Sequence, residues 1–171
     1  ENKGNSVRLQ LEPVRAVFVQ CSREKIDVQR YSYLDMNPQS KTIEGSWNIQ
    51  FIEGGPVFPD NIITDQLQSW TGMGDEDTKR FSGTALYSTK FFWNEKVSSA
   101  LLDLGEVKDC ARVKLNGRVI GSLLGPTYKI KVDNLIKGEN LLEVEVTNVA
   151  ANRIRDYDIR GVSWKKFYNI N

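Results

Sequence analysis

The sequence predicts an all-β protein with the antiparallel strands of a β-sandwich. The clearest signal is a run in which apolar Ala111, Val113 and Leu115 alternate with charged residues, as in a half-buried strand. Asn116-Gly117 follows directly and tolerates the positive φ angles of a two-residue type I′ turn, so it marks a hairpin. Short strand-like runs recur about every 8–12 residues, and no segment keeps a helical period beyond a turn or two, which favours a sandwich.

Strand signals follow one another along most of the chain. Trp47, Ile49 and Phe51 alternate with polar residues, and a long strand from 85 to 93 carries aromatic residues on one face. The other strands are predicted at 67–70, 100–104, 110–115, 118–122, 127–132 and 140–147. The expected core consists of Trp47, Phe51, Tyr87, Phe91, Val113, Leu115, Leu142, Val144 and Val146. A two-residue turn predicts that Val113 lies opposite Ile120.

Residues 1–42 are predicted to be a region separate from a sandwich domain at 43–171. Val7, Leu9 and Leu11 alternate with polar residues, and residues 16–19 form a continuous apolar run, so two strands are predicted. Residues 24–42 are polar and serve as a connection. Because exposed apolar strands are aggregation edges, we expect the region to pack on the sandwich or beside it, through Val7, Leu9, Val17 and Val19.

Length and charge restrict the classes of function. The 171 residues suffice for one ordinary domain, whereas a (β/α)₈ barrel needs about 250. The 23 basic and 22 acidic side chains nearly cancel and are dispersed, so nucleic acid is not an expected partner. No apolar run approaches the ~20 residues of a membrane span, and the chain begins with neither a signal peptide nor a typical N-terminus, as if cut within a linker.

The sequence contains no histidine, which removes the commonest general base and metal ligand. Two cysteines, Cys21 and Cys110, cannot by themselves build a structural zinc site. They are interpreted as buried free thiols, with a single disulfide as the alternative. The sequence leaves their redox state open.

Eight short motifs resemble, in order, the galactose-binding-like jelly-roll module of glycoside hydrolases of the family 2 "sugar-binding" type, in particular the C-terminal module of bacterial α-L-rhamnosidase-like proteins. They are Gly45-Ser-Trp47, Ser69-Trp70-Thr71, residues 81–87, Leu102-Asp-Leu-Gly105, Leu115-Asn-Gly117, Gly138-Glu-Asn-Leu141, Val146-Thr-Asn148 and residues 152–156. The first segment is similar to the last strands of the β domain that precedes this module. The resemblance implies an antiparallel jelly-roll sandwich. The segment 123–128 departs from many relatives, which carry a tryptophan and a Pro-aromatic pair there.

Sugar recognition requires an exposed aromatic platform with polar groups beside it. Trp70, flanked by hydroxyl residues in a loop-rich span, is the predicted platform, with Tyr128 at the rim. Asn152, Arg153 and Asp156 are the predicted hydrogen-bonding groups. The alternative interpretation of the charged segment 152–161 is an ion-paired loop that ties the C-terminal segment to the sandwich.

Two groups of carboxylates are candidates for catalysis or metal binding. Asp156 and Asp158 could stand at the separation of about 5–9.5 Å that a glycosidase acid pair requires, but no surrounding pocket is indicated. No catalytic residue and no cofactor are therefore predicted. The acidic run at 75–77 could join a structural calcium site of the kind such modules often hold, although its spacing is not that of regular calcium ligands.

The resemblance implies a non-catalytic accessory module of a larger bacterial glycoside hydrolase, periplasmic or extracellular. Such a module binds carbohydrate or braces the catalytic domain of the same parent chain, and the parent acts on a plant or host glycan. The alternatives are a protein-interaction or adhesion sandwich and a free-standing glycosidase. The sequence names neither the sugar, nor the specificity of the parent, nor the oligomeric state.

Overall fold

The computed structural model describes residues 6–11, 13, 16–28, 33, 40–97 and 99–164. The chain forms two compact units, residues 1–41 and 42–171. Within the first unit no described residue belongs to a helix or strand, so the strands predicted at 7–11 and 16–19 are not formed. Val7, Leu9, Val17 and Val19 are 46–67% exposed rather than buried. A strand needs a hydrogen-bonded neighbour, and the described part of this unit supplies none. Packing of the region on the sandwich stays a prediction.

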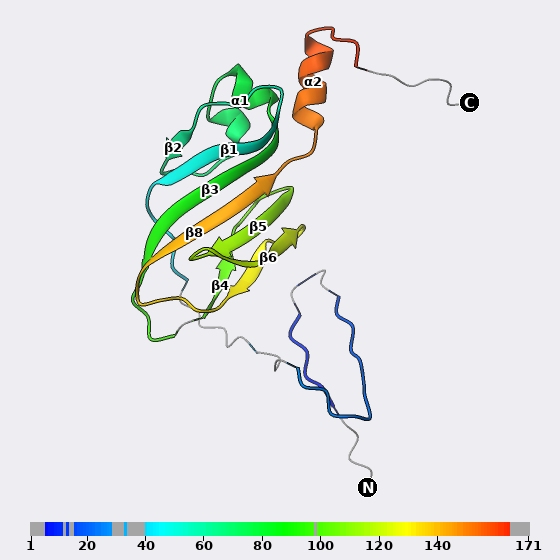
Figure 1. Cartoon of the computed structure of the whole chain (residues 1–171), viewed down its shortest axis with the longest axis vertical. Coiled ribbons are helices and arrows are strands. Elements are labelled where there is room, and N and C mark those ends of the chain that lie inside the picture. The colour runs from blue at the N-terminus through cyan, green and yellow to red at the C-terminus, as the bar shows by residue number, and fades with distance from the viewer. Residues whose placement is uncertain are drawn as a thin grey trace, which may run out of the picture. The chain divides into compact units, whose positions relative to one another are not determined.

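The second unit is an all-β antiparallel jelly-roll sandwich, which confirms the predicted fold class (Figure 1). Its larger sheet has the order β2-β1-β3-β8-β5-β6. The strands of this sheet are β1 (Trp47–Gly55), β2 (Ile62–Thr64), β3 (Ser82–Trp93), β5 (Cys110–Leu115), β6 (Arg118–Leu124) and β8 (Gly138–Thr147). The smaller sheet pairs β4 (Ala100–Asp103) with β7 (Lys129–Val132). Three short helical segments complete the unit: η1 (Trp70–Gly72), α1 (Glu76–Arg80) and α2 (Ala151–Ile159).

The core lies on the inner face of the larger sheet. Alternation in β1 and β8 turns every second side chain inward, as the period of a strand requires. Leu102 of β4 and Ile130 of β7 pack against this face from the smaller sheet. The predicted core residues Trp47, Phe51, Tyr87, Val113, Leu115, Leu142 and Val144 are buried, and Phe91 and Val146 are partly buried.

The hairpin turn is as predicted, but the strand register beyond it is not. Asn116 has φ +51° and Gly117 φ +76°, so both central residues are in the left-handed region of a type I′ turn. Leu115 pairs with Arg118 and Val113 pairs with Gly121 rather than with Ile120. A β-bulge in β6 accommodates Ile120 as the extra residue, and such a bulge cannot be read from turn length.

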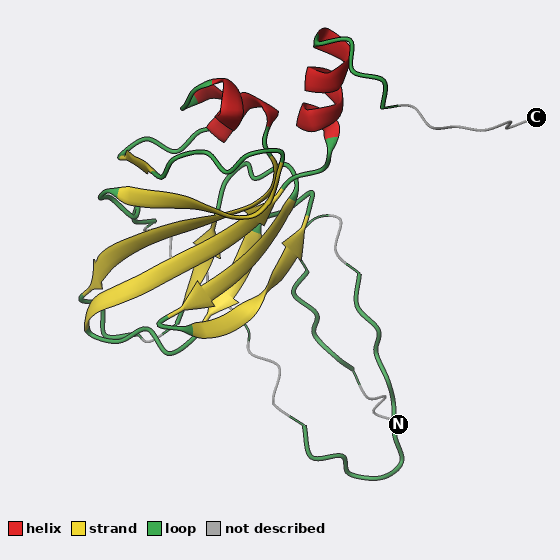
Figure 2. Cartoon of the chain, turned by 45° about the horizontal axis from the view of Figure 1, so that its top comes forward, coloured by secondary structure: helices red, strands yellow, loops and turns green. Residues whose placement is uncertain are grey.

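The helical segments were not predicted. The possible strand at 67–70 ends instead in η1, and 151–159 forms a helix where an ion-paired loop was the alternative. Both helices lie at one end of the sandwich (Figure 2). α2 buries no residue and is mostly polar, so its sequence does not show the wide apolar stripe from which a helix is recognised.

Tyr87 provides a pH-dependent contribution to stability. Burial raises the pKa of its phenol from 10.0 to about 12. The unfolded chain therefore releases this proton at lower pH than the folded chain. The contribution is complete below pH 10 and is lost as pH rises from 10 through about 12. We expect the melting temperature of Tyr87→Phe to fall less steeply than that of the wild type between pH 10 and about 12. An equally steep fall in both chains would contradict a role of Tyr87 in this pH dependence.

Candidate functional site

All five residues predicted to contact sugar lie at one end of the sandwich. Thr147 pairs with both Thr84 and Cys110, and Cys110 also pairs with Leu124, so these strand ends lie level. The segments 125–128 and 148–156 leave the sheet at this end, and the segment 65–81 rejoins the sheet here at Ser82 (Figure 1). The shared end is compatible with a loop site, but the burial of Trp70 and Tyr128 is not.

Trp70 is a core residue and cannot be a sugar platform. Its side chain is only 5% exposed. Its ring packs edge-on against Phe51 and Phe81, with centroids 6.0 and 6.2 Å apart. The flanking Ser69 and Thr71 hydroxyls bond to each other at 2.9 Å. The hydroxyl residues beside the tryptophan therefore form a local turn, and the indole closes this end of the core.

Tyr128 is also buried, with 7% exposure, so the predicted rim position is wrong. Its hydroxyl donates to the carbonyl oxygen of Asp109 at 2.6 Å, because a buried phenol needs a partner. The ring forms one wall of a shallow hollow of about 270 Å³. The other lining residues are Gly105, Glu106, Lys108, Gly125 and Pro126, none of them aromatic.

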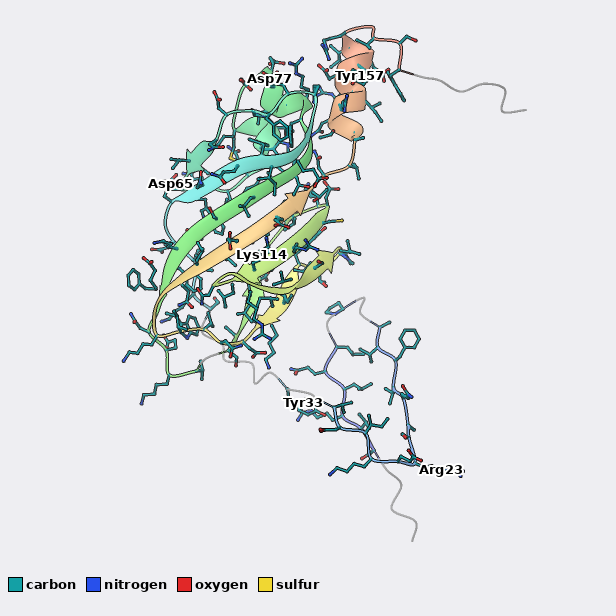
Figure 3. The ribbon with its side chains drawn as sticks, in the orientation of Figure 1. Arg23, Tyr33, Asp65, Asp77, Lys114 and Tyr157 are labelled. Atoms are coloured by element: carbon teal, nitrogen blue, oxygen red, sulfur yellow. The ribbon has the colours of Figure 1, made fainter. Side chains whose placement is uncertain are left out.

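The three polar residues predicted to bind sugar are engaged within the protein. Asn152 Nδ2 donates to the carbonyl oxygen of Phe81 at 3.4 Å, and the backbone N–H of Arg153 donates to Ser82 Oγ at 3.3 Å. Arg153 Nε donates to the hydroxyl of Tyr157 at 2.6 Å, and its guanidinium lies 5.4 Å from that ring's centroid. Asp156 forms an ion pair with Arg160 one turn along α2. Tyr157 thus lies at the centre of these contacts on α2 (Figure 3).

The same helix rules out an acid pair at Asp156 and Asp158. The Asp156 carboxylate is held by Arg160, and Asp158 accepts a hydrogen bond from Trp164 Nε1 at 2.8 Å. Neither carboxyl lines the hollow beside Tyr128 or the groove along Cys110 and Glu145, and both lie on a helix with no buried residue.

The acidic run at 75–77 does not fit a calcium ion. Asp75 caps α1 and accepts from the backbone N–H and the hydroxyl of Thr78, both at 3.0 Å. These bonds lower the pKa of the Asp75 carboxyl. Glu76 pairs with Lys79 and Asp77 with Arg80. The three carboxylates are thus used separately, and among the described residues no three acidic, cysteine or histidine side chains converge as metal ligands.

A shallow groove on the outer face of the larger sheet was missed by sequence reasoning. It has a volume of about 510 Å³ and is lined by Ile52, Glu53, Thr84, Cys110, Ala111, Arg112, Ser122, Leu124, Glu145 and Thr147. Glu145 forms ion pairs with both Lys114 and Arg112, at 2.5 and 3.6 Å. In the sequence most of these residues occupy the outward-facing positions of alternating strands. Alternation alone does not distinguish a groove from a flat face exposed to solvent.

Both cysteines are free, but they are exposed rather than buried. Cys110 begins β5 on the outer face, among the residues that line the groove. The strand alternation explains the error: Ala111, Val113 and Leu115 take the inward positions, so Cys110 points outward.

The fold and the comparisons agree on a galactose-binding-like module of the kind found in glycoside hydrolases. No family model matches the sequence. The chain is 37% identical to the "Putative beta-glucuronidase" of Formosa agariphila over 128 residues, which are 68% of this chain and 10% of that protein.

Solved structures give the same relationship. The rhamnosidase from Novosphingobium sp. PP1Y is 30% identical, with a TM-score of 0.60, over 72% of this chain and 12% of that one. The Bifidobacterium dentium beta-glucuronidase, 23% identical with a TM-score of 0.51 over 64% of this chain and 21% of its own, shares the fold. The chain therefore spans about a tenth of the length of the curated relative it matches. Among the described residues no helix is long and apolar enough to cross a membrane.

Proposed function

We propose that this chain is a non-catalytic accessory module of a larger bacterial glycoside hydrolase, and that its role is structural rather than sugar binding. The observation that carries the proposal is the engagement of all five predicted sugar contacts within the module. Trp70 and Tyr128 are buried. The Asn152 side chain donates to the carbonyl oxygen of Phe81, and the side chains of Arg153 and Asp156 are bonded within α2, to Tyr157 and Arg160.

The relatives support the hydrolase context. The Novosphingobium rhamnosidase and the Formosa protein are matched over only 12% and 10% of their lengths. A module of this size in such a protein would pack against the catalytic domain of the same parent chain. The parent would act on a plant or host glycan in the periplasm or outside the cell, and the module itself would need no cofactor.

The C-terminal helix provides the clearest bracing element. α2 is bound to the start of β3 through Phe81 and Ser82, and the Arg153 guanidinium lies near Gly55 at the end of β1. A segment fixed at several points can transmit a defined orientation to whatever follows it, whereas a flexible connection cannot. Arg153 therefore acts as a structural contact between α2 and the sheet.

The test measures activity, sugar binding and stability on the same chain. We expect no hydrolysis of aryl rhamnosides or aryl glucuronides, since no carboxylate pair flanks a cleft among the described residues. We also expect no saturable change in tryptophan fluorescence with rhamnose or glucuronic acid up to concentrations that detect a millimolar Kd, about −4 kcal/mol.

Arg153→Ala should lower the free energy of unfolding by about 1–2 kcal/mol, through loss of the Tyr157 contacts. Arg155→Ala, on the exposed side of α2, is the matched control and should change it by less than about 0.5 kcal/mol. Saturable sugar binding that Arg153→Ala abolishes without loss of stability would contradict the structural role.

A further inference from the structure

The Asn116-Gly117 turn is the one Asn-Gly dipeptide in the sequence, and its asparagine is exposed to water. In such a pair the backbone nitrogen of the glycine can attack the asparagine side chain, because glycine has no side chain to shield that nitrogen. The exposed tip of a β-hairpin would therefore be an expected place for spontaneous deamidation.

Both ends of the Asn116 amide are held by hydrogen bonds. Its Oδ1 accepts from the backbone N–H of Leu141 at 2.8 Å, and its Nδ2 donates to Oδ1 of Asn140 at 3.0 Å. The backbone N–H of Asn116 also donates to the carbonyl oxygen of Leu141 at 2.9 Å. These three bonds fix the side chain toward β8 and oppose its rotation toward the nitrogen of Gly117.

Asn140 is a rigid anchor for this arrangement. It is 1% exposed. Its Nδ2 donates to the carbonyl oxygens of Ile136 at 2.8 Å and Gly138 at 3.1 Å, while its Oδ1 also accepts from the backbone N–H of Ile136 at 3.0 Å. A buried amide with every bond made cannot turn without leaving polar groups unpaired.

We propose that Asn116 is a latent deamidation site that the Asn140 amide keeps closed. In the reaction the Gly117 nitrogen loses its proton to solvent and bonds to Cγ of Asn116. The Cγ–Nδ2 bond breaks, Nδ2 takes up a proton from solvent and leaves as ammonia, and a cyclic succinimide remains. Water then opens the ring at either carbonyl, giving aspartate or isoaspartate at position 116.

Either product would release the hairpin tip from β8. Aspartate has no N–H to donate to Asn140 Oδ1, so two oxygens would face each other there. Isoaspartate also lengthens the backbone by one carbon inside a turn whose residues both require positive φ. Modification is therefore a one-way loosening of the contact between the β5–β6 hairpin and the start of β8.

The experiment follows deamidation by peptide mass spectrometry, with the chain held in mildly alkaline buffer at 37 °C. The folded chain should deamidate at Asn116 at least ~10-fold more slowly than the same chain in urea, since a local opening that costs about 1.4 kcal/mol gives this factor. Equal rates in the two conditions would overturn the proposal.

Two variants separate the anchor from general instability. Asn140→Ala should raise the Asn116 rate toward that of the urea-unfolded chain. Thr84→Ala, which removes a buried side-chain hydrogen bond at the opposite end of the sheet, should leave it near the wild-type value. An unchanged rate in Asn140→Ala, or an equal rise in both variants, would also overturn the proposal. If Asn140→Ala does not fold, the comparison of Thr84→Ala with wild type, each with and without urea, still decides whether the folded turn protects Asn116.

Discussion

Phe81→Ala should lower the free energy of unfolding by about 3–5 kcal/mol, the range for deleting a buried phenylalanine. Phe81 is fully buried at the start of β3 and contacts three other aromatic rings. Its ring centroid lies 4.9 Å from that of Phe51, 6.0 Å from that of Phe58 and 6.2 Å from that of Trp70. The pairs with Phe51 and Trp70 are edge-on, and such pairs add stabilisation to that of the apolar area that burial removes from water. Removal of the ring would therefore leave a cavity among these three aromatic side chains.

The measurement is urea unfolding followed by tryptophan fluorescence and circular dichroism. Phe92→Ala is the matched control, because Phe92 is 72% exposed on the outer face of the same strand. Its free energy of unfolding should change by less than about 0.5 kcal/mol. Similar losses in the two variants would mean that the aromatic cluster contributes no more to stability than an exposed ring.

The alternation of apolar residues predicts most of the strands, although it missed β2 and the strand at 67–70 is not formed. β5 was predicted at its observed bounds, and the Asn116-Gly117 turn has the predicted conformation. Both depend on neighbouring residues alone: a period of two fixes which side chains turn inward, and an Asn-Gly pair tolerates two positive φ angles. The bulge at Ile120 was not predicted, because turn length fixes the pairing only at the tip of the hairpin. Beside the bulge β6 lies close to the smaller sheet, where an added Cβ on Gly121 would lie 2.8 Å from Ile130 Cδ1.

The predicted sugar site was wrong because contacts between separate elements bury its two aromatic residues, and the local sequence does not show such contacts. Trp70 stands between two hydroxyl residues, which is also the composition of an exposed loop. Its burial comes from Phe51 and Phe81, which different strands bring to it. Likewise, the charged segment after Asn148 was recognised as self-pairing, but its helix could not be predicted. α2 begins without a capping side chain, and its pairs at Arg153–Tyr157 and Asp156–Arg160 are one turn apart. Its docking on Phe81 and Ser82 is tertiary.

Gly83→Ala should lower the free energy of unfolding by at least about 3 kcal/mol, at or beyond the upper end of the usual cost of overpacking. Gly83 in β3 lies directly opposite Gly54 in β1. A Cβ added to Gly83 would lie 1.9 Å from the carbonyl oxygen of Glu53 and 2.7 Å from Cα of Gly54. Both atoms belong to the backbone, so no side-chain rotation relieves the clash and the two strands must separate.

Separation of the strands at this point would affect the end of the module that holds α2. Gly83 N–H donates to Asn148 Oδ1 at 2.8 Å, and its carbonyl accepts from the Asn148 N–H at 3.0 Å. Movement of Gly83 would strain both bonds just before the helix begins. The larger cost should therefore appear together with loss of α2, visible as reduced helical ellipticity before the main unfolding transition.

Gly105→Ala distinguishes this close approach from the general cost of placing alanine at a glycine position. Gly105 has φ +67° and nothing within 4 Å of an added Cβ, so its replacement should cost only the about 1–2 kcal/mol of a left-handed conformation. We expect Gly83→Ala to be less stable than Gly105→Ala. Recovery of Gly83→Ala only in aggregates, while Gly105→Ala folds, would agree with this order of stability. Equal stabilities of the two variants would mean that β1 and β3 can part at Gly54 and Gly83 without cost. In that case the close packing of Gly54 against Gly83 would not determine how β1 crosses β3. It would then also not determine where α2 begins after Asn148.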